Sequence, residues 1–286
     1  MVSVHLEISC IIKLMYISID VGGSNIRIAS FKSLESSNFE QLSKFEITND
    51  YEKDLGNIIH AILNLTKEEI EGIGIGVPAV LNEEKTQILN ANNIKSWTGK
   101  PLREDLLAKF NCPVILENDA TAAALGEAIY GSGVNKSFLF IIWGTGIGGT
   151  FVNRVHDDSY AISSQLGHQI VKWNGLTDTC RQRGCFEAYC SGGGIERRFG
   201  KPASQLSEEN WKEVEEIFAQ GLLNSIAIYP VNLVIFSGGV ALKQKKRIKN
   251  IGLILRKNLK MVPVPQLVLS KLGENAGVFG ALTLLR

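Results

Sequence analysis

The chain has 286 residues, 45% hydrophobic and 21% charged, which is an ordinary globular balance and a comfortable length for two domains. A net charge of +1 gives no electrostatic basis for nucleic acid or an anionic membrane as the main partner. Five cysteines in a chain this long do not indicate a disulfide framework, and no segment approaches the roughly 18–20 apolar residues of a membrane span. We therefore expect a cytoplasmic protein that binds neither nucleic acid nor a membrane.

The first 14 residues are fairly apolar but do not resemble a signal peptide. Residues 2–14 contain Glu7, and they lack both a basic start and a small-residue cleavage site. Met15 stands directly before the first motif strand. We expect Met15 to be an alternative start and residues 1–14 to be an extension.

A glycine-rich hairpin follows this extension. Residues 16–20 (YISID) and 26–31 are two short strands joined through Gly22 and Gly23, a typical hairpin turn. The glycines let backbone N–H groups approach a phosphate, and Ser24 and Asn25 add donors. Asp20 would then face the phosphate, which makes sense only with a Mg²⁺ ion between them. An ordinary hairpin without a ligand is the alternative.

The next 80 residues alternate predicted elements with one polar loop. Residues 33–50 read as strand and loop, 54–65 as a helix with apolar positions at helical spacing, 70–77 as a strand, and 101–110 as a helix. The loop 82–97 contains Asn90, Asn92 and Asn93 shortly before Trp97. Amides beside an aromatic ring suit the hydroxyls and ring face of a sugar, and they suit ordinary turn chemistry equally well.

The central stretch 113–130 (PVILENDATAAALGEAIY) places two polar residues between a strand and a helix. An apolar strand over 113–116 is followed by Asn118 and Asp119, and then by an Ala-rich helix from Ala120. Ligands of open α/β sheets bind at the carboxyl ends of strands, and a helix N-terminus favours an ionised carboxylate. Asp119 is therefore a candidate to accept a proton from a sugar hydroxyl that Asn118 holds, or else simply the N-cap of the helix.

A second glycine-rich turn repeats the first. The strand 138–143 leads into Gly144, Thr145, Gly146 and Gly148, and a returning strand follows. Two such hairpins suggest two similar halves around a cleft. The turn matches neither the dinucleotide fingerprint nor a P-loop, because no Lys-Ser/Thr and no helix follow it.

The segment 163–191 contains candidate metal ligands. His168, Cys180, Cys185 and Asp178 are residue types that bind zinc tetrahedrally. The alternative is a pair of buried thiols with an unrelated histidine.

The last third of the chain alternates helices and strands. A helix over 210–228 precedes a strand over 229–236 that ends on Ser237, Gly238 and Gly239, a turn able to cradle an adenosine or its phosphates. The basic run 243–249 (KQKKRIK) is expected to be a solvated helix face. A strand over 267–269 and a small-residue helix over 275–285 complete the chain.

Together these segments resemble the ROK family (repressor, open reading frame, kinase) of sugar kinases, within the actin-like ATPase superfamily. The resemblance covers nearly all of 15–286. The segments that carry it are Asp20-Val21-Gly22-Gly23, Glu117-Asn118-Asp119-Ala120, Ala124-Leu125-Gly126-Glu127, 144–149 (GTGIGG), Leu166-Gly167-His168, Gly184-Cys185-Phe186-Glu187 and Ser237-Gly238-Gly239.

The resemblance implies an α/β, two-domain actin-like (ribonuclease H-like) fold with a cleft between the domains. The smaller domain would span 1–118, with the helix 275–286 packing back on it, and the larger one 119–274. Asp119 would be the catalytic base. The family's sugar-binding positions correspond to Asn93, Asn118, Gln165, His168 and Glu187, and both hairpins with the Ser-Gly-Gly turn would hold ATP and Mg²⁺.

Three departures from the family pattern stand out. Gln165 replaces a glutamate that touches the sugar, although an amide can still hydrogen-bond a hydroxyl. Asp178 replaces one of three cysteines that bind zinc beside His168, so both zinc binding and its loss remain open. Ala79 stands where glycine is common.

We expect ATP-dependent phosphorylation of a glucose-type hexose at its 6-hydroxyl, by a homodimer or homotetramer. An N-acetylmannosamine or N-acetylglucosamine kinase is the alternative, and Gln165 motivates a third, a sugar-binding protein without kinase activity. Repressors of the family carry an N-terminal helix-turn-helix, for which about 14 residues before Tyr16 are too few.

Overall fold

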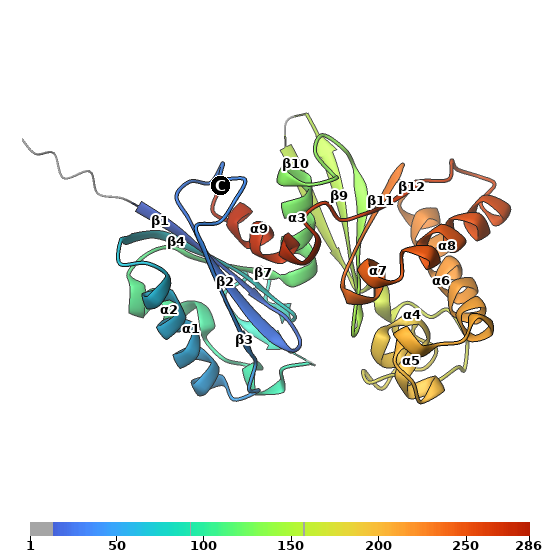
Figure 1. The fold of residues 1–286 in the computed structure, drawn as a ribbon, viewed down its shortest axis with the longest axis horizontal. Helices are drawn as coiled ribbons and strands as arrows, with labels where there is room; N and C mark the ends of the chain where they lie inside the picture. The colour runs from blue at the N-terminus through green and yellow to red at the C-terminus, as the bar shows by residue number, and fades with distance from the viewer. Residues whose placement is uncertain (1–13, 92, 157) are drawn as a thin grey trace, which may run out of the picture.

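Two five-stranded sheets organise the chain (Figure 1). The computed structural model describes residues 14–91, 93–156 and 158–286. The first sheet, in the order β3-β2-β1-β4-β7, consists of β1 (Leu14–Val21), β2 (Asn25–Phe31), β3 (Gln41–Glu46), β4 (Glu69–Val77) and β7 (Val114–Asn118). The second, in the order β10-β9-β8-β11-β12, consists of β8 (Phe138–Trp143), β9 (Ile147–Val155), β10 (Asp158–Ser164), β11 (Leu233–Ser237) and β12 (Gln266–Leu269).

The helices pack around these sheets. They are α1 (Tyr51–Leu65), α2 (Leu102–Phe110), α3 (Asp119–Tyr130), α4 (Phe186–Cys190), α5 (Gly192–Phe199), α6 (Glu208–Ile228), α7 (Gly239–Lys243), α8 (Lys245–Asn258) and α9 (Ala276–Thr283). A small pair of strands, β5 (Val80–Leu81) and β6 (Ile88–Asn90), and the 3-10 turns Lys95–Trp97, Leu166–His168, Ala203–Gln205 and Gly273–Asn275 complete them. No helix among the described residues is both long and apolar enough to cross a bilayer.

Each sheet has the same plan, which the paired glycine-rich turns predicted. β1 runs antiparallel to β2 and parallel to β4, and β8 runs antiparallel to β9 and parallel to β11. Each hairpin therefore places its turn at the carboxyl end of a strand that is central in its sheet. The two turns end up beside the same cavity, as described below.

Each of the two sheets packs against its own hydrophobic cluster. In the first, Ile17 and Ile19 of β1 are fully buried in one cluster with residues of α1 and α2. In the second, Trp143 of β8 is fully buried, and its ring centroid lies 4.2 Å from that of Phe218 in α6. Burial of such large side chains contributes on the order of 2–3 kcal/mol each, so every sheet has its own source of stability.

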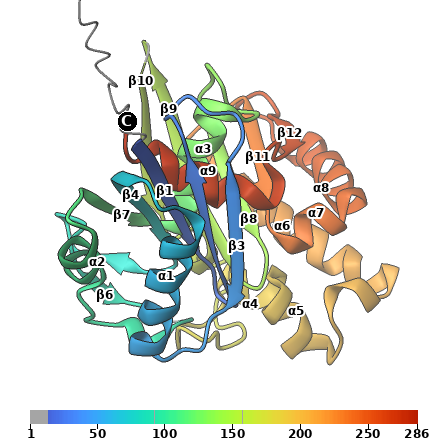
Figure 2. The ribbon, with the colours of Figure 1, turned by 60° about the vertical axis from the view of Figure 1, so that its left-hand side comes forward.

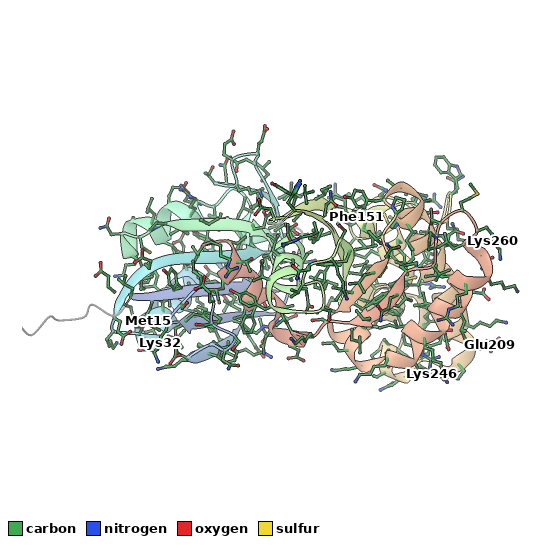
Figure 3. The ribbon with its side chains drawn as sticks, turned by 90° about the horizontal axis from the view of Figure 1, so that it is seen from above. Met15, Lys32, Phe151, Glu209, Lys246 and Lys260 are labelled. Carbon is green, nitrogen blue, oxygen red and sulfur yellow. The ribbon has the colours of Figure 1, made fainter. Side chains whose placement is uncertain are left out.

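Helices α3 and α9 lie between the two sheets (Figure 2). Helix α9 packs on β1 and β4, and α3 packs on α9 and on β9 and β10. The C-terminal segment thus returns to the first sheet. From above, Met15 and Lys32 lie at one end of the molecule, and Glu209, Lys246 and Lys260 lie at the other (Figure 3). The predicted boundary after residue 118 stays a prediction.

Glu127 fastens the end of α3 to the segment that leads into α9. Its fully buried carboxylate accepts hydrogen bonds from Ser132 N–H at 2.6 Å, from the Ser270 hydroxyl at 2.6 Å and from Leu272 N–H at 2.9 Å. Replacing Glu127 with Ala would leave one buried and two partly buried donors without their acceptor. We expect the free energy of unfolding to fall by about 3 kcal/mol, measured by urea denaturation.

A matched exposed glutamate provides the control for this prediction. Glu216 lies on the solvent side of α6, and its replacement by Ala is expected to change the unfolding free energy by no more than about 0.5 kcal/mol. Equal effects of the two substitutions would show that Glu127 does not fasten the two segments.

The prediction that the basic run is a solvated helix face is wrong for one residue. Arg247 is buried, pairs with Glu208 at 2.7 Å and Glu215 at 3.2 Å, and lies over the ring of Trp211. It therefore ties α8 to α6. The sequence showed only a run of positive charge, because both partner carboxylates lie more than 30 residues earlier in the chain.

Candidate functional site

A cavity of about 540 Å³ lies at the carboxyl ends of strands from both sheets, and it is lined by most of the predicted site residues. This volume suits a small-molecule site. The predicted residues that line it are Asp20, Gly22, Gly23, Ser24, Asn93, Asn118, Asp119, Gly144, Thr145, Gly146, Gly148, Gln165, His168, Glu187, Ser237, Gly238 and Gly239. Asn25 is not among them. Its carbonyl closes the first hairpin by accepting the Gly22 N–H at 2.8 Å.

Asp119 lies at the start of α3 with its carboxylate in this cavity. The side chain is half-buried, and Oδ1 accepts the N–H of Ala120 at 2.8 Å. The carboxylate reaches the cavity, yet the surrounding protein leaves it little solvation. Burial raises the pKa of Asp119 to about 7, with a further increase from Asp20 and an opposing effect of the Ala120 N–H. The prediction that the helix terminus would keep this carboxylate ionised is therefore wrong: burial dominates.

The N-cap of α3 is Asn118 rather than Asp119. The side-chain oxygen of Asn118 accepts the N–H groups of Ala120 at 3.1 Å and Thr121 at 3.2 Å. Its amide nitrogen donates to the carbonyl of Ala79 at 3.3 Å. An amide carries two hydrogens, so one donor remains for a ligand. Asn118 thus caps the helix, and the Asp119 carboxylate shares only the Ala120 N–H with it.

Asp20 has a cationic partner that sequence reasoning missed. Arg27 faces Asp20 across the β1–β2 hairpin and pairs with its carboxylate at 3.0 Å. Burial raises the pKa of Asp20, and Arg27 opposes this increase. Arg27 also lines the cavity. Its place seven residues after Asp20, opposite it in the predicted hairpin, was the signal that would have identified it.

The second hairpin and the Ser-Gly-Gly turn form the other wall. Gly238 has a φ of +92°, and a Cβ there would lie 2.6 Å from the carbonyl oxygen of Trp143. Only glycine allows this close approach of the turn to β8. Glu187 accepts the N–H of Ile147 at 2.6 Å, which fixes the glutamate beside the glycine turn, and burial raises its pKa.

The remaining polar lining comes from loops. Gln165 is exposed and precedes the 3-10 turn that carries His168. Asn90 and Asn93 line the cavity, whereas Asn92 lies outside the described residues. Thr179 lines it too, although sequence reasoning did not single it out, because nothing distinguishes it from other loop threonines.

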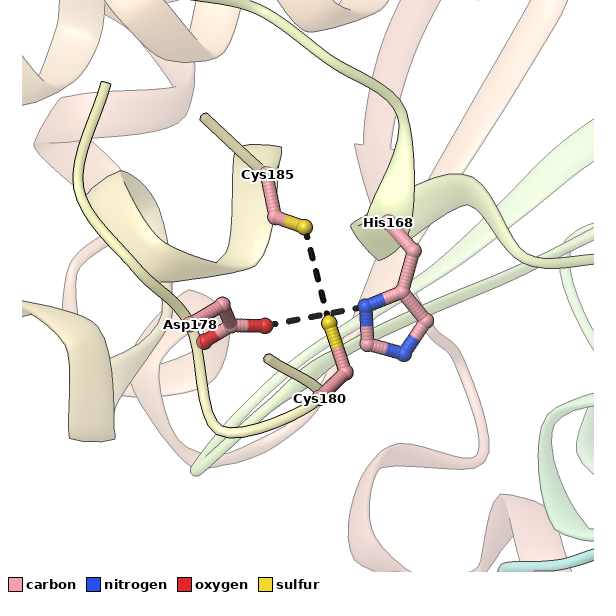
Figure 4. A group of neighbouring side chains, drawn as sticks. All are labelled: His168, Asp178, Cys180 and Cys185. Carbon is pink, nitrogen blue, oxygen red and sulfur yellow. Dashed lines mark hydrogen bonds and ion pairs between the residues drawn. The ribbon is translucent and has the colours of Figure 1, made fainter. Parts of the chain in front are cut away.

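His168, Asp178, Cys180 and Cys185 come together in one cluster beside the cavity (Figure 4). One donor atom from each lies within 4.8 Å of the others. The two sulfurs are 3.7 Å apart, close to the spacing of about 3.8 Å that two thiolates have around a tetrahedral Zn²⁺ with bonds of about 2.3 Å.

Two further observations show that the cluster suits a cation. His168 Nδ1 and Asp178 Oδ2 are buried and have no hydrogen-bond partner among the described residues, although they lie 3.6 Å apart. Burial, together with the Cys180 thiol, raises the pKa of Cys185 to about 12, so its thiolate form requires a neighbouring positive charge. The four residues thus form a possible metal site.

Comparison with known proteins identifies the family. The ROK family profile matches residues 16–286. A glucokinase from Streptomyces coelicolor is 30% identical over 209 residues, which cover 72% of this chain and 64% of the relative. A xylose repressor from Caldicellulosiruptor bescii is 30% identical over 213 residues, covering 70% of this chain and 53% of the relative. The matches thus span less than two thirds of these relatives.

The fold is also that of solved relatives. A ROK family glucokinase from Streptomyces griseus, crystallised with glucose and AMPPNP, superposes with a TM-score of 0.80, covering 94% of this chain and 98% of that one at 23% identity. The two mixed sheets confirm the predicted actin-like α/β fold. Because the family profile spans nearly the whole described chain, this protein belongs to the ROK family, which includes both glucokinases and repressors.

Proposed function

We propose that this protein is an ATP-dependent sugar kinase that phosphorylates a glucose-type hexose at its 6-hydroxyl. The observation that carries the proposal is the half-buried Asp119 carboxylate, with a pKa raised to about 7, between two glycine-rich turns in one cavity. A group that titrates near neutral pH suits proton transfer. A repressor that only senses a sugar needs neither this base nor two phosphate-binding turns.

Asp119 acts as general base in the proposed reaction. It accepts the proton of the 6-hydroxyl while the hydroxyl oxygen bonds to the γ-phosphorus of ATP, and the bond from this phosphorus to the β–γ bridging oxygen breaks. ADP leaves with that oxygen. Such transition states are loose, so positioning and charge stabilisation supply most of the rate. The backbone N–H groups of both glycine turns are placed to stabilise charge on the phosphates.

The nucleotide site would use both hairpins and the Ser-Gly-Gly turn. Asp20 would hold Mg²⁺, which when bound neutralises phosphate charge. Two observations support this: the charge of Asp20 raises the pKa of Asp119, and Arg27 is the cation that pairs with Asp20 among the described residues. Asp20 needs more positive charge than Arg27 supplies once phosphates arrive.

The sugar site would use other polar side chains that line the same cavity. Asn93, Asn118, Gln165, His168 and Glu187 would bind its hydroxyls, because all of them line the cavity. Zn²⁺ held by the cluster of His168 and its three neighbours would be structural, orienting His168 from behind the sugar. An N-acetylmannosamine or N-acetylglucosamine kinase is the second candidate, because the hydroxyl-binding groups suit either kind of sugar.

A sugar panel tests the proposal. Coupled ADP release with ATP and Mg²⁺ should show turnover on glucose. Mannose, N-acetylmannosamine and N-acetylglucosamine are assayed in parallel as alternative substrates. Calorimetric binding of the same sugars separates a binding protein from a kinase. Tight sugar binding without any ADP release would contradict the proposed activity, and Gln165→Glu would then test whether the missing glutamate restores turnover.

The pH dependence of the reaction should report Asp119. We expect kcat/KM for the sugar to be constant above about pH 7 and to fall tenfold per pH unit below it, because the protonated acid cannot accept the hydroxyl proton. Initial rates between pH 5.5 and 9, in buffers of constant ionic strength, measure the profile. A profile that stays flat down to pH 5.5, as a carboxylate with an ordinary pKa near 4 would give, would show that burial does not tune this group.

The family also suggests a homodimer or homotetramer, which we carry over as a proposal. Light scattering of the purified protein would give the mass of the assembly, to be compared with 31.4 kDa for one chain.

A further inference from the structure

The two carboxylate oxygens of Asp178 have different surroundings. Oδ1 accepts a hydrogen bond from Nη2 of Arg197 at 3.1 Å. Oδ2 points at Nδ1 of His168 from 3.6 Å, a distance too long for a hydrogen bond, and it is buried without a hydrogen-bond partner among the described residues. The side chain is fully buried, so bulk water does not reach Oδ2.

Arg197 reaches Asp178 from a well-anchored helix. Ser191 is the N-cap of helix α5, and its hydroxyl accepts the Gly194 N–H at 2.9 Å. The N–H of Gly192 donates to the carbonyl of Gly144 at 2.8 Å, which ties the same helix to the second glycine turn. The guanidinium therefore comes from a fixed backbone.

A carboxylate differs from a thiolate in the number of donors it offers. A cysteine sulfur is one ligand atom, whereas an aspartate can bind a metal through one oxygen or through both. Bidentate binding would make this cluster a five-coordinate, more oxygen-rich site. The ion pair with Arg197 engages Oδ1, whereas Oδ2 is the oxygen directed at His168.

We propose that Arg197 is a positioning residue for a metal ligand: by holding Oδ1 it makes Asp178 a one-oxygen ligand and so keeps the cluster four-coordinate. The cluster then selects Zn²⁺ over ions such as Mg²⁺ or Mn²⁺, which prefer octahedral oxygen sites. The inference concerns metal binding and does not depend on the proposed kinase activity.

Metal affinity tests this role directly. The full-length protein is stripped with a chelator, and Zn²⁺ affinity is measured by competition with a chromophoric chelator. We expect Arg197→Met to weaken Zn²⁺ binding by about 10–100-fold. Arg198→Met is the matched control, because Arg198 lies on the same helix and binds Glu213 at 2.7 Å and the Tyr189 carbonyl at 2.8 Å rather than Asp178. Its effect on Zn²⁺ affinity should be within about 2-fold.

Cobalt reports coordination number independently of affinity. Co²⁺ in the wild-type site should give the intense visible bands of a four-coordinate ion with thiolate ligands. Arg197→Met frees Oδ1, so these bands should weaken as a fifth ligand binds. Arg197→Lys retains a cation and should recover part of both the affinity and the band intensity. Far-UV circular dichroism checks that each variant is folded.

Replacing Asp178 with Cys tests whether the effect of Arg197 on Zn²⁺ affinity requires a second carboxylate oxygen. A thiolate has no second donor to restrain, so Arg197→Met in the Asp178→Cys background should change Zn²⁺ affinity by only about 2-fold. An equal loss in both backgrounds would overturn the proposal, because the effect of Arg197 would then not depend on a second carboxylate oxygen. It would also be overturned by wild-type protein that binds no Zn²⁺, or by unchanged affinity and cobalt bands in Arg197→Met.

Discussion

Asp119→Asn is expected to lower kcat for sugar phosphorylation by about 10²–10⁴-fold, because an amide cannot accept the hydroxyl proton. The substitution is nearly isosteric, and its side-chain oxygen can still accept the Ala120 N–H that Asp119 accepts at 2.8 Å. The sugar Kd should therefore change by only a few fold. Coupled ADP release at pH 8 and calorimetric sugar binding measure the two quantities separately.

The same substitution should raise the stability of the protein. Burial raises the folded-state pKa of Asp119 from its ordinary value of 3.8 to about 7. The folded state thus binds this proton more tightly than the unfolded chain does, and the stability it contributes is lost as pH rises from about 4 to about 7. Asn is neutral throughout, so Asp119→Asn should have a higher Tm than wild type at pH 8.

Asp158→Asn is the control for both measurements, since Asp158 is exposed on β10. It should leave both kcat and Tm essentially unchanged. A kcat of Asp119→Asn within tenfold of the wild-type value would show that Asp119 is not the general base. A lower Tm at pH 8 would show instead that the ionised carboxylate stabilises the fold.

Sequence alone located Asp119 but not its protonation. The switch from an apolar strand to an Ala-rich helix is a local signal, and it correctly placed this residue at the junction of β7 and α3. Its pKa depends on burial by parts of the chain that are distant in the sequence, and on the charge of Asp20 in the first hairpin. A helix-terminus argument considers only the local dipole, which burial outweighs here.

The metal cluster shows the same division between local and distant information. The resemblance named all four candidate ligands, and the structure brings them together through a turn in which Arg181 adopts a left-handed φ of +68°. Arg197 was missed because its ion pair with Asp178 joins residues 19 apart in a region without simple periodicity. Spacing rules identify ligands of a familiar type, but they do not identify the residues that orient them.

Gly280→Ala should be among the most destabilising single-methyl substitutions in the chain. A Cβ at Gly280 would lie 2.1 Å from the carbonyl oxygen of Ala122 and 2.7 Å from the nitrogen of Ala123. Both atoms belong to the backbone of α3, so neither can move aside as a flexible side chain would. We expect the free energy of unfolding to fall by at least about 3 kcal/mol, measured as a shift of the urea midpoint.

Gly56→Ala provides the matched control, because Gly56 lies inside α1 and a Cβ there would meet no atom within 4 Å. Alanine favours a helix, so this variant should gain about 0.5–1 kcal/mol. An unchanged midpoint for Gly280→Ala would mean that α9 can move away from α3 without cost. If the expected loss is found, the folded fraction of Gly280→Ala should also bind sugar more weakly, because α3 carries Asp119 at its first position and α9 sets where α3 lies between the two sheets.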